Sequence, residues 1–170
     1  MRGGTNRPRT AAVAVLLALA AAAGCGVRPT GVVDGGEPAK GLTKDLRIYY
    51  VRGSALQGVT RPDASIEEPN GALKLLSDTP DWAAERGLVN LVRLGPYWTS
   101  GTGHRITLHS PGASFDSPSD RLPNGQLVCT LARAQSFLHR DESIRPDDVR
   151  VSLDDGERTY GPYQCSQFLT

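Results

Sequence analysis

The sequence predicts an α+β fold, a small antiparallel sheet with two helices packed on one face, preceded by a disordered signal peptide and linker. Segments with a two-residue apolar period, typical of half-buried strands, are interspersed with segments whose apolar residues recur every three or four positions, typical of helices. Short turns join several strand-like segments, which favours antiparallel hairpins. The expected order is two strands, a helix, two strands, a helix and two strands.

The predicted domain comprises residues 44–170 and opens with a hairpin. Apolar positions alternate along residues 46–51, which are rich in β-branched and aromatic side chains, so this segment is predicted to be a strand. The Arg-Gly-Ser sequence at 52–54 supplies a turn. Residues 56–61 are expected to return as a second strand, which Pro62 ends.

A helix in two parts is predicted next. Apolar residues recur at helical spacing from Ala72 to Ala83, so Asn70 is interpreted as the helix cap. Pro80 is expected at the first position of the second part, with Gly87 ending it. Residues 88–94 (L-V-N-L-V-R-L) then have the character of a strand.

The second half repeats this alternation. Residues 105–109 are predicted to form a short strand, and residues 111–123 a loop. Asn124 is interpreted as the cap of a second helix, whose apolar face runs from Leu127 to Leu138 with Cys129 at its margin. Two further strands, at 149–153 and 157–160, are predicted to form a terminal hairpin around Asp155-Gly156.

Residues 1–24 have the pattern of a lipoprotein signal peptide. Three arginines precede a 13-residue Ala/Leu/Val run, and Ala-Ala-Gly stands directly before Cys25. The alternative is a transmembrane helix, but the run is shorter than the roughly 20 residues that span a bilayer. We therefore expect cleavage before Cys25, lipid on its thiol, a flexible Gly/Pro-rich linker at 25–43, and anchoring on the extracytoplasmic face of the cell membrane.

Charge and cysteine content fit that location. The leader takes three of the 19 basic residues, leaving 16 against 18 acidic ones, and such a mixed surface gives no reason to propose nucleic-acid binding. Once Cys25 carries lipid, Cys129 and Cys165 remain as an even pair in an oxidising compartment. A disulfide between them is predicted. The alternative is two buried free thiols.

No local motif for catalysis or metal binding is present. The sequence contains three histidines, His104, His109 and His139. None of them has metal-ligand spacing to another histidine with a cysteine or acid nearby. A G-x-S-x-G elbow, an S-x-x-K motif and a phosphate loop are absent, and the adjacent acids at 67–68 and 147–148 would point apart in extended chain. The prediction is a protein that is not an enzyme and uses no metal or cofactor.

Tyr97 and Trp98 are the candidate contact residues for a ligand or partner. They follow Gly-Pro in a segment interpreted as a loop, where aromatic side chains are available for binding. Trp82 is instead expected to be a core anchor, because aromatic residues at helix positions more often belong to the core.

Three segments carry a family resemblance by their order and spacing. They are R-I-Y-Y-V-R-G-S-A-L-Q-G-V-T-R (47–61), A-L-K-L-L with T-P-D-W-A-A-E-R-G-L (72–88), and G-Q-L-V-C-T-L-A (125–132). Over roughly residues 46–156 the chain resembles the GerMN domain, a sporulation and germination module of bacterial lipoproteins, including actinobacterial ones. The family usually has Gly-Pro-Thr after the paired leucines, where this chain has Ser-Asp-Thr-Pro at 77–80.

The resemblance implies a non-catalytic module that contacts other envelope proteins, in some relatives a sensor kinase. The expected function is therefore a lipid-anchored accessory protein that binds an envelope partner in assembly or signalling. A cell-wall or small-ligand-binding lipoprotein is the alternative, motivated by Tyr97 and Trp98. An envelope hydrolase comes third, since no motif supports it.

Overall fold

The computed structural model describes residues 45–169. The predicted signal peptide, Cys25 and the linker at 25–43 lie outside the described residues. Within the described part, none of the helices combines the length and the apolarity needed to span a bilayer.

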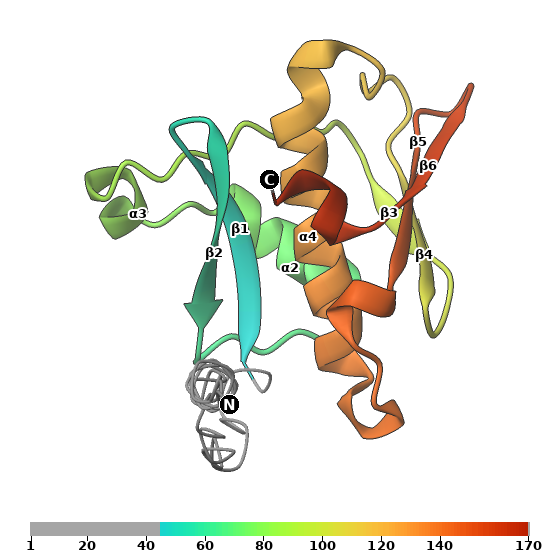
Figure 1. The fold of residues 1–170 in the computed structure, drawn as a ribbon, viewed down its shortest axis with the longest axis horizontal. Helices are drawn as coiled ribbons and strands as arrows, with labels where there is room; N and C mark the ends of the chain where they lie inside the picture. The colour runs from blue at the N-terminus through green and yellow to red at the C-terminus, as the bar shows by residue number, and fades with distance from the viewer. Residues whose placement is uncertain (1–44, 170) are drawn as a thin grey trace, which may run out of the picture. The chain divides into compact units, whose positions relative to one another are not determined.

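The strands of the described residues form two sheets. The first is the hairpin of β1 (Leu46–Arg52) and β2 (Ala55–Arg61), paired antiparallel. The second has the order β3-β4-β5-β6 (Figure 1), and its strands are β3 (Trp98–Ser100), β4 (Arg105–His109), β5 (Arg150–Asp154) and β6 (Thr159–Tyr163). The α+β class is confirmed, and so are both predicted hairpins.

One pair departs from the antiparallel expectation. β4 and β5 are parallel, whereas β3–β4 and β5–β6 are antiparallel. The chain between β4 and β5 contains the long helix α4 (Arg121–Leu138), and parallel neighbours need such a crossover because a tight turn cannot join them. This crossover brings together two strands that lie far apart in the sequence.

The helices fill the space beside the hairpin. α2 (Pro69–Ser77) and α4 both pack against β1, and α4 also contacts β5. Figure 1 accordingly shows α4 running between the hairpin and the four-stranded sheet. Residues of α4 from Asn124 to Ala132 are buried on every side of the helix, Cys129 included, so the expectation that Cys129 sits at a margin is wrong.

The predicted two-part helix is present as α2 and α3 (Asp81–Glu85), but its caps differ. Glu68 is the N-cap of α2 and Pro69 its first residue, so Asn70 lies inside the helix. Pro80 is the N-cap of α3 and not its first position. Gly87 follows the C-cap with φ of 68°, the left-handed conformation that favours glycine at a helix end.

Asn124 is also not a cap. Ser117 caps the short 3₁₀ helix η2 (Pro118–Asp120), and α4 continues directly from it at Arg121. Asn124 therefore lies one turn inside α4, where its Nδ2 donates to the Phe115 carbonyl at 2.9 Å. The side chain fastens the preceding loop to the helix.

The predicted strand at residues 88–94 does not form. The segment makes one isolated antiparallel bridge, between Val51 and Val89. Gln126 of α4 accepts the Leu91 N–H through Oε1 at 2.8 Å and donates Nε2 to the Tyr49 carbonyl at 3.0 Å. A buried side chain has thus taken over hydrogen bonds that a neighbouring strand would make.

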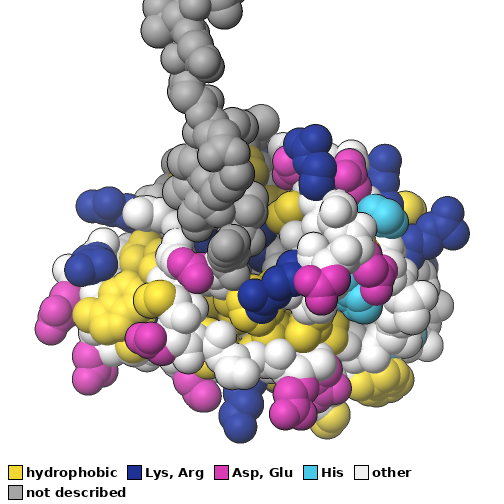
Figure 2. All heavy atoms as spheres, turned by 90° about the horizontal axis from the view of Figure 1, so that it is seen from below, with side chains coloured by type: hydrophobic (Ala, Val, Ile, Leu, Met, Phe, Trp, Pro, Cys, Tyr) yellow, Lys and Arg dark blue, Asp and Glu magenta, His cyan; other side chains and the backbone are white. Residues whose placement is uncertain are grey.

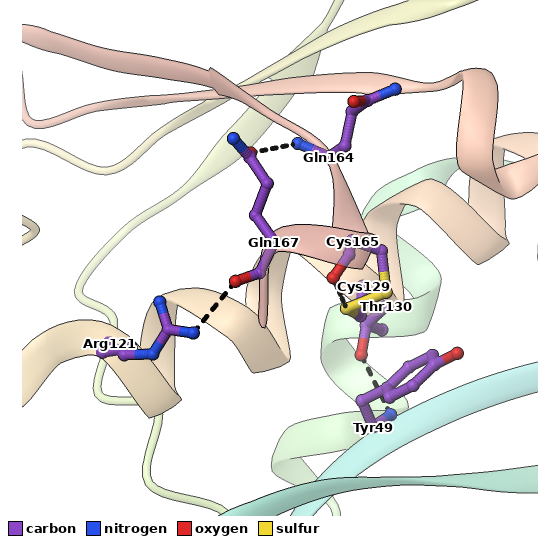
Figure 3. The surroundings of a disulfide bond; sticks show 7 residues. All are labelled: Tyr49, Arg121, Cys129, Thr130, Gln164, Cys165 and Gln167. Carbon is purple, nitrogen blue, oxygen red and sulfur yellow. Dashed lines mark hydrogen bonds between the residues drawn. A yellow bond between two sulfur atoms is a disulfide. The ribbon is translucent and has the colours of Figure 1, made fainter. Parts of the chain in front are cut away.

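The C-terminus is fastened to α4 by the disulfide expected from the sequence. Cys129 bonds to Cys165 at the start of the 3₁₀ helix η5 (Cys165–Phe168), and both are buried. Figure 3 shows the second attachment, in which Arg121 donates to the Gln167 carbonyl at 3.0 Å. η5 is held at two points along α4.

Candidate functional site

The outer face of the four-stranded sheet carries a row of three functional side chains. Trp98 of β3 pairs with His109 of β4, and His109 pairs with Asp154 of β5. Directly paired residues project from the same face of a sheet, so these side chains are neighbours. The alternate residues of β4 and β5 point the other way and form part of the core: Ile106, Leu108, Val151 and Leu153.

Hydrogen bonds connect this row to a serine. Ser100 lies two residues after Trp98 on β3 and therefore on the same face. Its Oγ is 2.8 Å from His109 Nε2, and His109 Nδ1 is 2.6 Å from Asp154 Oδ2. We call Trp98, Ser100, His109 and Asp154 the sheet-face cluster.

Asp154 is held as a carboxylate. The Gly156 N–H donates to its Oδ1 at 3.0 Å, and this bond, followed by the one from His109, lowers the pKa of Asp154 from its ordinary value. An ionised carboxylate accepts the Nδ1–H of a neutral imidazole, which leaves Nε2 as an acceptor. When the imidazole is neutral, the Ser100 hydroxyl is thus the donor to His109 Nε2.

Trp98 covers the imidazole. The two rings stack with centroids 5.0 Å apart and an interplanar angle of 12°. Trp98 remains 49% exposed, whereas the side chains of His109 and Asp154 are 23% and 24% exposed. The cluster thus presents an indole and a serine hydroxyl to solvent, with the histidine and the acid partly shielded beneath them.

The predicted contact pair, Tyr97 and Trp98, is divided by the fold. The sequence suggested that Trp98 lies in a loop, but it is the first residue of strand β3. Tyr97 precedes the strand and packs against the core, where burial, followed by the nearby charge of Asp78, raises the pKa of its phenol. Only Trp98 reaches the outer face. Trp82 is partly buried against the core, as expected, with the Arg86 guanidinium 5.2 Å from its ring centroid.

The other histidines lie apart from the cluster. His104 is exposed in the turn before β4, and His139 Nδ1 is 3.0 Å from Glu142 Oε1 beyond the end of α4. Among residues 45–169, no three metal-ligating side chains come together. Cys25, the predicted lipidation site, lies outside this range.

Sequence reasoning missed Ser100, His109 and Asp154 as a group. Each residue lies on a different strand, so no local spacing connects them. The one available signal is that His109 ends an alternating segment in which the apolar residues point inward. Even that signal gives no partner, because the partner depends on the parallel pairing of β4 with β5.

The surface around the domain carries mixed charge. Figure 2 shows acidic and basic side chains interspersed on the face that it displays, with hydrophobic side chains reaching the surface between them. The exposed large hydrophobic residues of the described part are Val89, Leu91, Trp98 and Leu169. Of these, Trp98 has its ring stacked on a hydrogen-bonded neighbour.

Comparison of the chain with family models finds no match, and neither does comparison with curated proteins or with solved structures.

Proposed function

We propose that this chain is a lipid-anchored extracytoplasmic accessory protein whose GerMN-like domain, residues 44–170, binds a protein partner in the cell envelope. A membrane sensor kinase is one such partner, and the role is assembly or signalling. The leader supports this placement, because three arginines, a short apolar run and small residues precede Cys25.

The observation that carries the proposal is the fixed and exposed indole of Trp98. Tryptophan is enriched among the residues that contribute most to protein interfaces. Binding costs free energy when a mobile side chain must be ordered, and Trp98 is already held against His109, which Asp154 and Ser100 hold in turn. Its strand, β3, is also an edge of the sheet, so a partner can approach from the side as well as from the face.

Photocross-linking in the native cell tests this proposal. A photoreactive amino acid at Thr107, which pairs with Ser100 on the same face, is expected to capture an envelope protein. The matched control carries it at Gln57, an exposed residue of the other sheet. Capture at Thr107 that disappears in Trp98→Ala supports the proposal. Capture that is equal at both positions, or that Trp98→Ala leaves unchanged, contradicts it.

Glycan binding is the second candidate, and the same indole favours it. A flat aromatic face beside a hydroxyl and a carboxylate offers both a stacking surface and hydrogen-bond partners for a sugar. Pull-down with purified peptidoglycan distinguishes the two candidates. Binding that requires Trp98, without a cross-linked protein, favours the glycan, and cross-linking without peptidoglycan binding favours the protein partner.

A further inference from the structure

Ser100, His109 and Asp154 are connected in the order of a nucleophile, a base and an orienting carboxylate. Ser100 Oγ lies 2.8 Å from His109 Nε2, within the range in which a base can take a hydroxyl proton. His109 Nδ1 lies 2.6 Å from Asp154 Oδ2 on the opposite side of the ring. Such sets are recognised by geometry and roles and not by sequence position.

The surroundings keep this set in one arrangement. The Gly156 N–H donates to the second oxygen of Asp154, which favours the orientation of the carboxylate toward His109. The Trp98 ring covers one face of the imidazole and restricts its rotation. An imidazole held at Nδ1 by a carboxylate and covered by an indole has its Nε2 directed at the serine, which is what a general base requires.

We propose that Ser100 is the nucleophile of an acyl-transfer site that hydrolyses esters, with His109 as general base and general acid and Asp154 as a positioning residue. This activity goes beyond the partner binding proposed above. An envelope hydrolase was the third function considered from the sequence, and this proposal names the residues that would carry out its chemistry.

The reaction balances as ester plus water giving carboxylic acid plus alcohol. Ser100 Oγ adds to the ester carbonyl carbon while its proton passes to His109 Nε2. The tetrahedral intermediate collapses, the bond to the alkoxy oxygen breaks, and His109 returns the proton to the departing alcohol. Water then attacks the acyl-serine as His109 takes its proton, and the acid leaves as that proton returns to Ser100 Oγ.

A tight turn follows Ser100 directly in the chain. β3 ends at Ser100, and Gly101 follows with φ of 112°, a conformation that L side chains rarely adopt. A Cβ at Gly101 would collide with the Arg105 carbonyl oxygen, so the backbone passes close to the start of β4. The N–H groups of Gly101 and Thr102 are the backbone donors next to the nucleophile in the chain, and in this proposal they are the groups that would donate to the oxyanion.

The substrate class follows from exposure and charge. Ser100 is exposed and Trp98 is half exposed, so the ester group is one that approaches from solvent. The indole provides an apolar contact for a short acyl group. The Asp154 carboxylate, close beneath, disfavours anionic substrates. A short, uncharged acyl ester such as p-nitrophenyl acetate is therefore the probe.

The chain contains its own matched controls. His139 is paired with Glu142 as His109 is with Asp154, at 3.0 Å, but among residues 45–169 no serine is hydrogen-bonded to its other nitrogen. Ser114 donates to Asp120 at 2.8 Å and has no imidazole partner. The decrease in hydrolysis rate in His139→Ala measures what an ordinary surface histidine contributes. The decrease in Ser114→Ala measures what an ordinary surface serine contributes.

The test is hydrolysis of p-nitrophenyl acetate by the full chain with its disulfide intact, with a fluorophosphonate probe located by mass spectrometry. Ser100→Ala and His109→Ala are expected to lower kcat/KM about 100-fold, while His139→Ala and Ser114→Ala leave it unchanged. Asp154→Asn is expected to lower kcat with little change in KM, which a merely structural role would not produce. Melting temperatures of all variants verify folding.

Labelling of the wild-type chain with the fluorophosphonate tests the proposal without relying on the folding of a variant. The fluorophosphonate is expected on Ser100 and not on Ser114, and His109→Ala is expected to abolish it. The proposal is overturned if Ser100→Ala hydrolyses the ester as fast as wild type, or if the probe modifies Ser100 no faster than Ser114.

Discussion

His109 Nδ1 and Asp154 Oδ2 lie 2.6 Å apart, although 45 residues separate them in the chain. Their strands, β4 and β5, are parallel neighbours with His109 directly opposite Asp154. The contact therefore links the two sides of the α4 crossover on the outer face of the sheet. The same hydrogen bond thus orients His109 in the sheet-face cluster and joins β4 to β5 in the four-stranded sheet.

Asp154 is expected to make folding stability depend on acid pH. Its folded pKa lies below the ordinary value of 3.8, chiefly through the Gly156 N–H bond and then through His109. A carboxylate with a lowered pKa stabilises the fold above the ordinary value, and this contribution is lost as the pH falls through the folded pKa. Asp154→Asn should lower the melting temperature at pH 7, and the difference from wild type should shrink below about pH 4.

The measurement is thermal unfolding of both chains between pH 3 and pH 7. Asp63→Asn, which removes one carboxylate at an exposed position, is the control for net charge. A difference for Asp154→Asn that stays constant over this range would contradict the stated role of the carboxylate.

Local patterns predicted the elements of this fold better than the partners of each element. The β1–β2 hairpin and β4 could be predicted because their alternation and turns lie within a few residues of each other. Strand β3 could not be predicted, because it has only three residues and the glycines and proline around it are typical of a loop. The sheet-face cluster was out of reach for a related reason, because Asp154 meets His109 only through the parallel pairing of β4 with β5.

The segment 88–94 illustrates how tertiary contacts override a local sequence pattern. Its leucine and valine content suits a strand, yet Gln126 on α4 accepts from the Leu91 N–H and donates to the Tyr49 and Val89 carbonyls. No spacing within the segment reveals that a glutamine 35 residues away from Leu91 will provide these bonds.

Gln126→Leu is expected to destabilise the domain by about 2 to 3 kcal/mol, because it leaves buried backbone groups unsatisfied at nearly constant side-chain volume. Gln126 is fully buried and so is its bond to the Tyr49 carbonyl, so water cannot replace that bond. Thr130→Val is the matched comparison, since it removes only the hydrogen bond from the Tyr49 N–H to the Thr130 hydroxyl. It should lower the free energy of unfolding by less than Gln126→Leu does. Urea unfolding gives both values.

Hydrogen exchange adds the local readout for the same variants. The Leu91 amide should exchange faster in Gln126→Leu and remain protected in Thr130→Val. Equal protection of Leu91 in the two variants would show that Gln126 does not hold the segment.

The Cys129–Cys165 disulfide is expected to stabilise the domain by about 4 kcal/mol, because it closes a long loop in the unfolded chain. It also fastens η5 to α4 (Figure 3). Cys129→Ser and Cys165→Ser should therefore lower the free energy of unfolding by similar amounts, and the double variant should cost little more. Urea unfolding without reductant measures this, and additive losses would contradict a single shared bridge.

Cys25 is expected to decide where the chain resides. Lipidation at this cysteine needs two or more acyl chains for durable attachment, since one chain gives only marginal membrane binding. Cys25→Ala should leave the protein unprocessed or release it from membranes, whereas Cys129→Ser should keep it attached, because that cysteine belongs to the disulfide. Fractionation after labelling with a fatty acid makes the comparison. A wild-type chain that reaches the membrane fraction without incorporating label would contradict the lipid anchor, and with it the envelope placement on which the partner proposal depends.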